Sequence, residues 1–236
     1  MNNYFLLSIF SLCLFLVGCD RVLSDSELID IKTYSNIDEA QLYPNDVIKL
    51  SLSDKDIRCF PGKFLEFKNL HRLSLDGSGQ LIIDEGILMY SKLQWIKISG
   101  YELVKFPDDI SSLKYLNYIS MSNCKLAIIP KGVFSNHNIE RLDLDGNLIH
   151  SIPSSIGNLK SLFILALCDN PLDSLPDAFY ELTELTKLNL KNTNITKIPA
   201  SLRSKEYLSI YIDESDFDSI YLDSIKRESK IIINYP

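Results

Sequence analysis

A period of 23 residues governs the middle of the chain. Seven consecutive frames follow one another without a gap, beginning at Val47, Leu70, Leu93, Leu116, Ile139, Leu162 and Leu185. When each frame is numbered from 1 to 23, positions 1, 4, 6, 11, 14 and 18 are apolar at 41 of 42 places, and the exception, Gln80, has Leu81 beside it. The hydrophobic fraction of 46% would give only about 19 such places by chance. Because one frame cannot bury its apolar row alone, the period predicts a solenoid of stacked rows.

Proline marks the same place in almost every row. Position 15 is proline in six of the seven frames, namely Pro61, Pro107, Pro130, Pro153, Pro176 and Pro199. Asp84 takes its place in the second row. Since proline cannot donate a hydrogen bond to a neighbouring strand, the chain must leave the strand and bend before this position. Each row is therefore predicted to be a short strand, a bend and an irregular return.

Two rows show the complete pattern most clearly. They are IERLDLDGNLIHSIPSSIGNLKS, residues 139–161, and LFILALCDNPLDSLPDAFYELTE, residues 162–184. Both resemble the leucine-rich repeat in its 23-residue L-x-x-L-P form, and the resemblance extends over residues 47–207. It implies an α/β-type solenoid of seven repeats, curved, with short parallel strands on the concave face and a mostly irregular or 3-10 helical convex side.

The same resemblance implies an inner asparagine at position 9 that bonds backbone groups of neighbouring rows. Asn147 and Asn170 fit this rule, and Cys124 is an accepted substitute. The other rows depart from it, with Lys55, Ser78, Tyr101 and Thr193 at that position. We therefore expect the first three repeats to be looser than the later ones.

Segments at both ends have the character of caps. Residues 19–46 are expected to form a tether and a capping helix, with Ser35 or Asn36 as the helix N-cap and acids in its first turn. Residues 208–236 are expected to form a C-terminal cap, in which a helix is followed by a strand over IIINY. The apolar side chains at helical spacing in this cap are Phe217, Ile220, Tyr221 and Ile225.

The first residues read as a processing signal. Residues 4–17 form an apolar run of signal-peptide length, too short for an ordinary membrane span. The following Leu16-Val17-Gly18-Cys19 resembles the lipobox of bacterial lipoproteins, although the first three residues carry no Lys or Arg. The resemblance implies a signal peptide over 1–18, lipid on Cys19 and a bacterial cell-envelope location on the periplasmic or cell-surface side. An ordinary secretory signal with a chance cysteine is the alternative.

Charge and cysteine content exclude several classes. The net charge of −7 comes from the ends, since residues 20–46 hold seven acids against two bases and residues 206–236 hold seven against three. No basic footprint of a nucleic-acid binder is present. Cys124 and Cys168 lie two rows apart, about 10 Å, which is too far for a disulfide. Cys59 is farther still from Cys124, so we expect all three thiols to be free, with Cys168 the most exposed.

Catalytic signals are weak. His71, His137 and His150 occupy different places in their rows, and no nucleophile, zinc or phosphate-loop motif is present. The run DLDGN at 143–147 faintly resembles a calcium loop, but it lacks the later ligands and the repeat already explains it. We therefore expect that the protein is not an enzyme and that it has no metal site and no cofactor.

The open face of the strands is the candidate site. Alternation sends positions 4 and 6 into the core, so positions 3 and 5 point outward. Position 3 reads Lys49, Arg72, Trp95, Tyr118, Arg141, Ile164 and Lys187, and the acids lie instead at positions 5, 7 and 8 as Asp54, Asp76, Asp143, Asp145 and Asp169. Trp, Tyr and Arg dominate binding hot spots. The predicted ligand-binding residues are Arg72, Trp95, Lys97, Tyr118 and Arg141.

Several interpretations of this face remain open. A protein or peptide ligand suits a shallow curved sheet, with Trp95 and Tyr118 close enough to touch. Aromatic and long basic side chains can also merely stabilise an exposed sheet. Carbohydrate binding by stacking on the two rings is another alternative, and a structural envelope lipoprotein without a dedicated ligand is a third. We expect a monomer.

Overall fold

The computed structural model describes residues 22–53, 57–62, 66–203, 205–213, 217–228 and 231–234. The chain divides into two units, Met1–Ile31 and Lys32–Pro236. The predicted signal segment and Cys19 lie outside the described residues. In the first unit, the short helix α2 (Asp25–Leu28) begins with a capping box, in which Ser24 and Glu27 bond each other's backbone N–H groups. None of the helices in the described ranges is long and apolar enough to cross a membrane.

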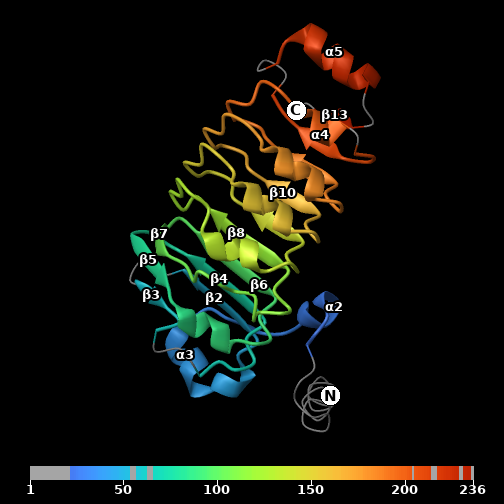
Figure 1. Ribbon diagram of the computed structural model, residues 1–236. Helices are drawn as coiled ribbons and strands as arrows, with labels where there is room; N and C mark the ends of the chain where they lie inside the picture. The colour runs from blue at the N-terminus through green and yellow to red at the C-terminus, as the bar shows by residue number, and fades with distance from the viewer. Residues whose placement is uncertain are drawn as a thin grey trace, which may run out of the picture. The chain divides into compact units, whose positions relative to one another are not determined.

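A parallel sheet of ten strands runs through the second unit (Figure 1). The seven predicted strands are β2 (Lys49–Ser53), β4 (Arg72–Asp76), β6 (Trp95–Ser99), β8 (Tyr118–Ser122), β9 (Arg141–Asp143), β10 (Ile164–Ala166) and β11 (Lys187–Asn189). The sheet continues beyond these seven strands at both ends. β1 (Thr33–Tyr34) and β12 (Ser209–Tyr211) were not predicted, whereas β13 (Ile232–Asn234) lies within the segment IIINY that was predicted as a strand.

Strand pairing follows the 23-residue period. Lys49 pairs with Arg72, and each later position 3 pairs with the next as far as Lys187. The period then shortens by one residue, because Lys187 pairs with Ser209. Tyr207, at the start of this shifted row, has a φ of 63° and is exposed. The neighbouring Leu208 is buried and takes over the core position.

Alternating burial places the apolar rows in a single core. In β2 and β4, the second and fourth residues are buried and the residues between them are half-buried. Leucine and isoleucine at positions 4 and 6 thus stack from row to row. Each fully buried side chain of this size contributes about 1.5–3 kcal/mol. This repeated burial is the main force that holds the rows together.

In the five rows from the third to the seventh, the backbone at position 8 is left-handed. The values of φ are 80° at Gly100, 56° at Asn123, 69° at Gly146, 56° at Asp169 and 52° at Asn192. Glycine enters this region without steric cost, and Asn and Asp tolerate it better than other residues. This explains why position 8 is restricted to these three residue types in the rows concerned.

Short helices follow position 15 on the opposite side of the core. Prolines are the N-caps of the 3-10 helices η3 (Lys131–Ser135), η4 (Ser154–Asn158) and η5 (Asp177–Glu181). The exception in the second row is also a cap, because Asp84 precedes η2 (Glu85–Met89) and accepts a hydrogen bond from Gly86 N at 2.8 Å. Asp84 therefore starts the return by a side-chain bond where the other rows use proline.

The first three rows contain a second sheet that we did not predict. It consists of β3 (Cys59–Phe60), β5 (Gln80–Ile83) and β7 (Glu102–Lys105). In later rows, the side chain of Asn147 satisfies backbone groups instead. Its Oδ1 accepts from Cys124 N and Leu126 N, and its Nδ2 donates to Met121 O and Leu144 O. Strand pairing therefore satisfies backbone groups in the early rows without asparagine, and the looser packing of these rows stays a prediction.

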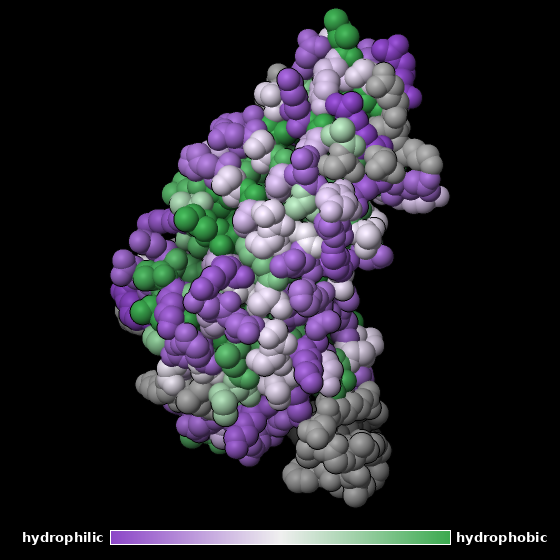
Figure 2. All heavy atoms as spheres, in the orientation of Figure 1, coloured by the Kyte–Doolittle hydropathy of each residue, from purple (hydrophilic) through white to green (hydrophobic). Residues whose placement is uncertain are grey.

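Figure 2 shows apolar side chains gathered along the flank that carries β5 and β7. At positions 10 to 13 of these and the next two rows, the exposed large apolar residues are Ile82, Val104, Ile128 and Leu148. The residues on either side of Ile82, Leu81 and Ile83, are fully buried. The flank therefore presents the outward half of an alternating pattern whose inward half belongs to the core.

Both ends of the second unit carry helices. At the start, Asn36 is the N-cap of α3 (Ile37–Leu42) and accepts from Asp38 N and Glu39 N, as predicted. The short 3-10 helix η1 (Pro44–Asp46) and the helix α4 (Ala200–Arg203) complete the helical segments, together with α5 (Ser219–Glu228). Phe217, just before α5, and Ile225, within it, are buried as expected, but Ile220 is 75% exposed and Leu222 is buried in its place.

Candidate ligand-binding face

The strand register brings four of the predicted site residues into one line. Arg72, Trp95, Tyr118 and Arg141 pair in sequence across β4, β6, β8 and β9. Lys97 lies two residues beyond Trp95 on β6, where it pairs with Ser74 and Ser120 on the adjoining strands. Lys97 thus shares the face but is not part of the line.

The four side chains in this line form a continuous stack. The ring centroids of Trp95 and Tyr118 are 4.7 Å apart, and their planes differ by 28°. The guanidinium carbon of Arg72 lies 5.3 Å from the Trp95 ring, and that of Arg141 lies 5.4 Å from the Tyr118 ring. We call these four residues the cation–aromatic stack. The prediction that the two rings touch is confirmed, and both ends of the ring pair carry a cation–π contact.

Polar side chains underlie the tyrosine end of the stack. Ser120 is fully buried and donates a hydrogen bond to Asp143 Oδ2 at 3.0 Å. Burial raises the pKa of Tyr118, and a hydrogen bond with Ser120 acts in the opposite direction. Tyr118 is therefore neutral at physiological pH.

Three acids of this face, Asp143, Asp145 and Asp169, lie in the row of Arg141 and in the row after it. Asp145 Oδ1 accepts a hydrogen bond from Cys168 N at 2.7 Å. Burial, followed by the charge of Asp143, raises the pKa of Asp145 to about 6. Asp169 differs, since hydrogen bonds from Cys168 and Asn192 lower its pKa. Asp76 lies exposed at the end of β4, and Asp54 is outside the described residues. Among the described residues, no group of three or more His, Cys, Asp or Glu side chains is placed to hold a metal ion.

The three cysteines of the second unit are free, as predicted, but their exposure differs from the prediction. Cys59 is the exposed one, because it lies at an outward position of β3 and donates to Asp84 Oδ2 at 3.3 Å. Cys168 is half-buried and its thiol contacts Asp169 Oδ2. Cys124 is buried, and desolvation raises its pKa to about 12. The prediction that Cys168 is the most exposed thiol was therefore wrong.

The histidines serve the backbone and do not converge. His71 is buried with Nδ1 2.7 Å from Asn69 O, and burial lowers its pKa. His137 Nδ1 lies 2.9 Å from Asn158 O, and His150 Nδ1 lies 3.0 Å from Leu148 O. Each imidazole ring therefore contacts one backbone carbonyl oxygen, in its own row or in a neighbouring row.

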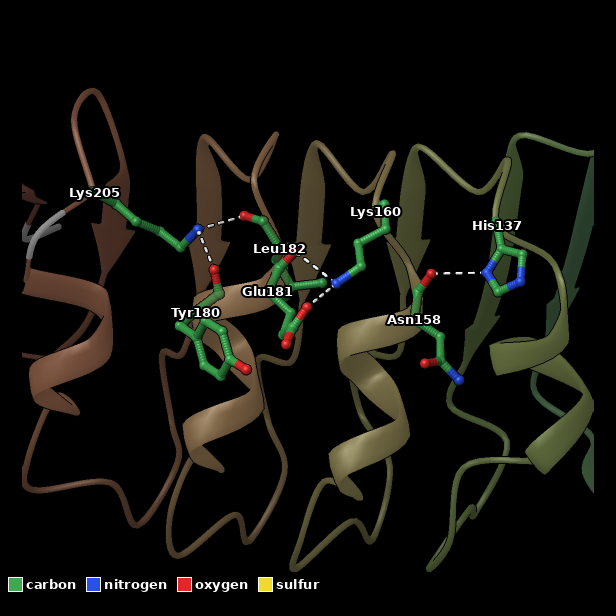
Figure 3. Close-up of polar contacts among 7 residues, drawn as sticks. All are labelled: His137, Asn158, Lys160, Tyr180, Glu181, Leu182 and Lys205. Atoms are coloured by element: carbon green, nitrogen blue, oxygen red, sulfur yellow. Dashed lines mark hydrogen bonds and ion pairs between the residues drawn. The ribbon is translucent and has the colours of Figure 1, made fainter.

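We did not predict the row of polar contacts at the ends of the 3-10 helices (Figure 3). Besides His137, it contains Lys160, whose ammonium contacts the Glu181 carboxylate of the next row. Lys205 Nζ donates to the carbonyl oxygens of Tyr180 and Leu182, at 3.4 and 2.5 Å. His137 and Lys160 both occupy position 22, so the 23-residue period could have indicated that their side chains lie in one row. These contacts join successive rows and have the character of structural ties.

Comparison with known proteins supports the same architecture. Residues 137–195 match the family model described as leucine rich repeat. The chain is similar to the structure of internalin C2 from Listeria monocytogenes, with 20% identity, a TM-score of 0.64 and coverage of 83% of this chain and 84% of that one. It is also similar to an internalin (inlF) from the same organism, with 17% identity, a TM-score of 0.55 and coverage of 77% and 58%. No curated protein matches the sequence. At these identities the likeness concerns the fold.

Proposed function

We propose, from the premise that this chain is a leucine-rich repeat protein, that it is a non-catalytic module whose concave sheet face binds a protein or peptide ligand. The observation that carries the proposal is the cation–aromatic stack, which lies in register on the outward side of four adjacent strands. Lys97 completes the proposed site. A parallel sheet with one open face offers such a ligand a broad, shallow surface.

The core does not need these large side chains. Ile96 and Ile98 on the same strand are fully buried and fill the inward positions of β6, whereas Trp95 is only half-buried. An aromatic ring on the outward side therefore has area left to bury. Trp, Tyr and Arg bury large area at modest entropic cost, which is why they dominate binding hot spots. These properties favour contact with a partner over a purely internal role.

Photo-crosslinking tests this proposal directly. A photoreactive amino acid replaces Lys97, on the proposed face, or Lys131, an exposed position on η3. After irradiation in envelope or host extract, we expect adducts of defined mass from position 97 and not from position 131. Adding Trp95→Ala and Arg141→Ala to the position 97 protein is expected to abolish them.

A matched double variant controls for general damage to the sheet. Ile164→Ala with Lys187→Ala alters the same position in rows outside the stack and is expected to leave the adducts unchanged. If the Trp95 and Arg141 substitutions also leave them unchanged, the stack is not the contact site. If position 97 gives no more adducts than position 131, the structural role without a dedicated ligand replaces the proposal.

The carbohydrate alternative meets a geometric obstacle. Sugars stack on free aromatic faces, yet Trp95 has Arg72 over one face and Tyr118 against the other. Tyr118 is covered in the same way by Trp95 and Arg141. A sugar ring would have to displace a guanidinium to reach either face. Binding on a glycan array that disappears in Trp95→Ala would nevertheless favour this alternative.

We also propose that lipid on Cys19 anchors the protein to a membrane of a bacterial cell envelope. The support is the Leu16–Cys19 sequence after an apolar run, and anchoring of this kind is stable when more than one acyl chain is attached. Metabolic labelling with an alkyne fatty acid is expected to mark the wild type and Cys59→Ser but not Cys19→Ser. Labelling that survives Cys19→Ser would refute the anchor without affecting the proposed ligand face.

A further inference from the structure

The cation–aromatic stack has no uncovered ring face. The strand order β4, β6, β8, β9 places Arg72 and Tyr118 on opposite sides of Trp95, and Trp95 and Arg141 on opposite sides of Tyr118. Both faces of each ring are thus in contact within the stack. What the stack can offer a ligand is its rim, made of ring edges and guanidinium edges.

This rim is electropositive. An aromatic ring carries negative potential on its faces and positive potential at its edge, so stacking hides the negative part and presents the positive part. Guanidinium groups whose planes cover a ring still have N–H donors along their own edges. A ligand that approaches the rim therefore meets C–H edges and charged N–H groups, which favour oxygen acceptors and above all carboxylates.

The positions beside the stack are basic or neutral on its first three strands, although Asp76 lies exposed at the end of β4. Positions 3 and 5 of β2, β4, β6 and β8 contain no acid, and Lys49, Arg72 and Lys97 are among their residues. Asp143 on β9 is the first acid at these positions. This cationic area stands out in a chain whose net charge is −7. Complementary charge across an interface accelerates association and excludes wrong partners.

We infer that the partner of this face is an acidic segment of a protein, whose carboxylates contact the rim of the cation–aromatic stack. The inference rests on the proposed function and specifies its ligand. From Arg72 to Arg141 the stack crosses three strand spacings, about 14 Å, which an extended peptide covers in about four residues. Carboxylates at that separation can reach both arginines at once.

A long polyanion fits this face less well than an acidic peptide. Phosphate backbones require an extended track of cations. Here the track is short, because Asp143 and Asp145 lie in the same row as Arg141, and Asp169 lies in the next row. These acids would repel a strand that continued past Arg141. A short segment with a few carboxylates avoids that repulsion.

The sole tryptophan makes the test specific, because Trp95 is the only source of indole fluorescence in the chain. The probes are synthetic peptides of about twelve residues, long enough to span the stack. One carries glutamates at the separation of the two arginines on a Ser/Thr background, and its counterparts carry glutamine or lysine at those places. We expect only the glutamate peptide to change the Trp95 emission, with affinity that falls as salt rises.

Matched variants tie the effect to the stack. Arg141→Gln changes an exposed side chain and is expected to weaken glutamate-peptide binding about tenfold. Lys187→Gln removes an exposed cation from the same position two rows beyond and is expected to change the affinity less than about twofold. Equal losses in the two variants would mean that only general charge attraction acts, and the inference would fail.

Other outcomes separate this inference from the proposed function. If the glutamate peptide does not bind, or binds no better than the glutamine peptide, the acidic ligand is wrong. Crosslinks from position 97 would still uphold a protein ligand in that case. If inorganic polyphosphate or phosphatidylglycerol vesicles bind as tightly as the glutamate peptide, the face selects anions in general and the protein segment is refuted. Loss of the position 97 crosslinks would refute the proposed function itself.

Discussion

Asn147 binds two rows together from inside the core. Its buried amide makes five hydrogen bonds to the backbone: Oδ1 accepts from Cys124 N and Leu126 N, and Nδ2 donates to the carbonyl oxygens of Met121, Leu144 and Asp145. Asn147→Ala leaves these groups without partners and without access to water, so we expect the free energy of unfolding to fall by about 3 kcal/mol. Urea denaturation followed by circular dichroism measures the change.

An exposed asparagine is the natural control for this experiment. Asn194 makes one hydrogen bond, from Nδ2 to Asp173 Oδ1 at 3.0 Å, at the surface. Asn194→Ala is expected to cost no more than about 0.5 kcal/mol. Similar losses at both sites would show that the buried amide is not what joins the rows.

Asp145 should make stability depend on mildly acidic pH. Its pKa is raised to about 6, above the ordinary value of 3.8. Between these values the folded chain binds more protons than the unfolded chain, so the free energy of unfolding decreases as pH rises through this window. We expect a decrease of about 1–2 kcal/mol, which Asp145→Asn abolishes while its amide oxygen still accepts from Cys168 N.

Denaturation at several pH values between 3.5 and 7 tests this sign, and Asp177→Asn, an exposed change in η5, is the control that should keep the slope. A slope that persists unchanged in Asp145→Asn would assign it to other groups. The sequence placed Asp145 correctly beyond the strand. It could not show the raised pKa, which depends on burial and on the charge of Asp143.

At the scale of elements, the second sheet is the clearest difference between expectation and structure. Ile82 N donates to Arg58 O at 2.9 Å in the pairing of β5 with β3. Ile82→Pro removes this donor from a central strand, so we expect a loss of about 3 kcal/mol. Ile82→Ala keeps the donor and truncates an exposed side chain, and its expected cost is below about 1 kcal/mol. Thermal unfolding of the two variants separates backbone pairing from side-chain packing.

The strands on the concave side were predictable and the outer elements were less so. Alternation and a fixed period determine which residues of Trp95–Ser99 face the core, because a slip of one residue would expose Ile96 and Ile98. The pairing of β3, β5 and β7 leaves a weaker trace, since their outward residues include Gln80, Ile82 and Val104 in no regular order. Asp84 was read as a missing proline, although its role as a cap has a sequence signature.

At the scale of the whole second unit, the hydroxyl group of Tyr221 joins the C-terminal cap to the last repeat by hydrogen bonds. Tyr221 Oη accepts from Ile198 N at 2.8 Å, accepts from Arg203 at 3.1 Å and donates to Ile198 O at 3.1 Å. Tyr221→Phe removes this oxygen, so we expect the cap to lose about 1–3 kcal/mol. In a solenoid, each row contacts mainly its neighbours, so the loss should be local.

Native-state hydrogen exchange detects that locality. Amides of β11 and β12 are expected to exchange faster in Tyr221→Phe, while those of β6 and β8 keep their rates. Tyr207→Phe, at an exposed tyrosine, is the control and should change neither set. Uniform acceleration along the sheet would show instead that the unit opens as one cooperative body.

The candidate site was predictable in its position and not in its chemistry. The period alone places Arg72, Trp95, Tyr118 and Arg141 on adjacent strands, and the register confirms it. Whether the rings lie flat, offering their faces, or stack on each other depends on side-chain torsions that the sequence does not encode locally. That difference decides between a surface for sugars and one for carboxylates.

The unbroken spacing from Lys49 to Lys187 also has an evolutionary side. A genetic exchange that removes one whole period, such as residues 93–115, leaves every remaining outward side chain on the same face. This deletion would place Arg72 on the strand next to that of Tyr118 and would remove Trp95 from the cation–aromatic stack. Duplication of the same segment would lengthen the line by a second indole. Ligand preference can therefore change in steps of one period, while the apolar interior keeps its pattern.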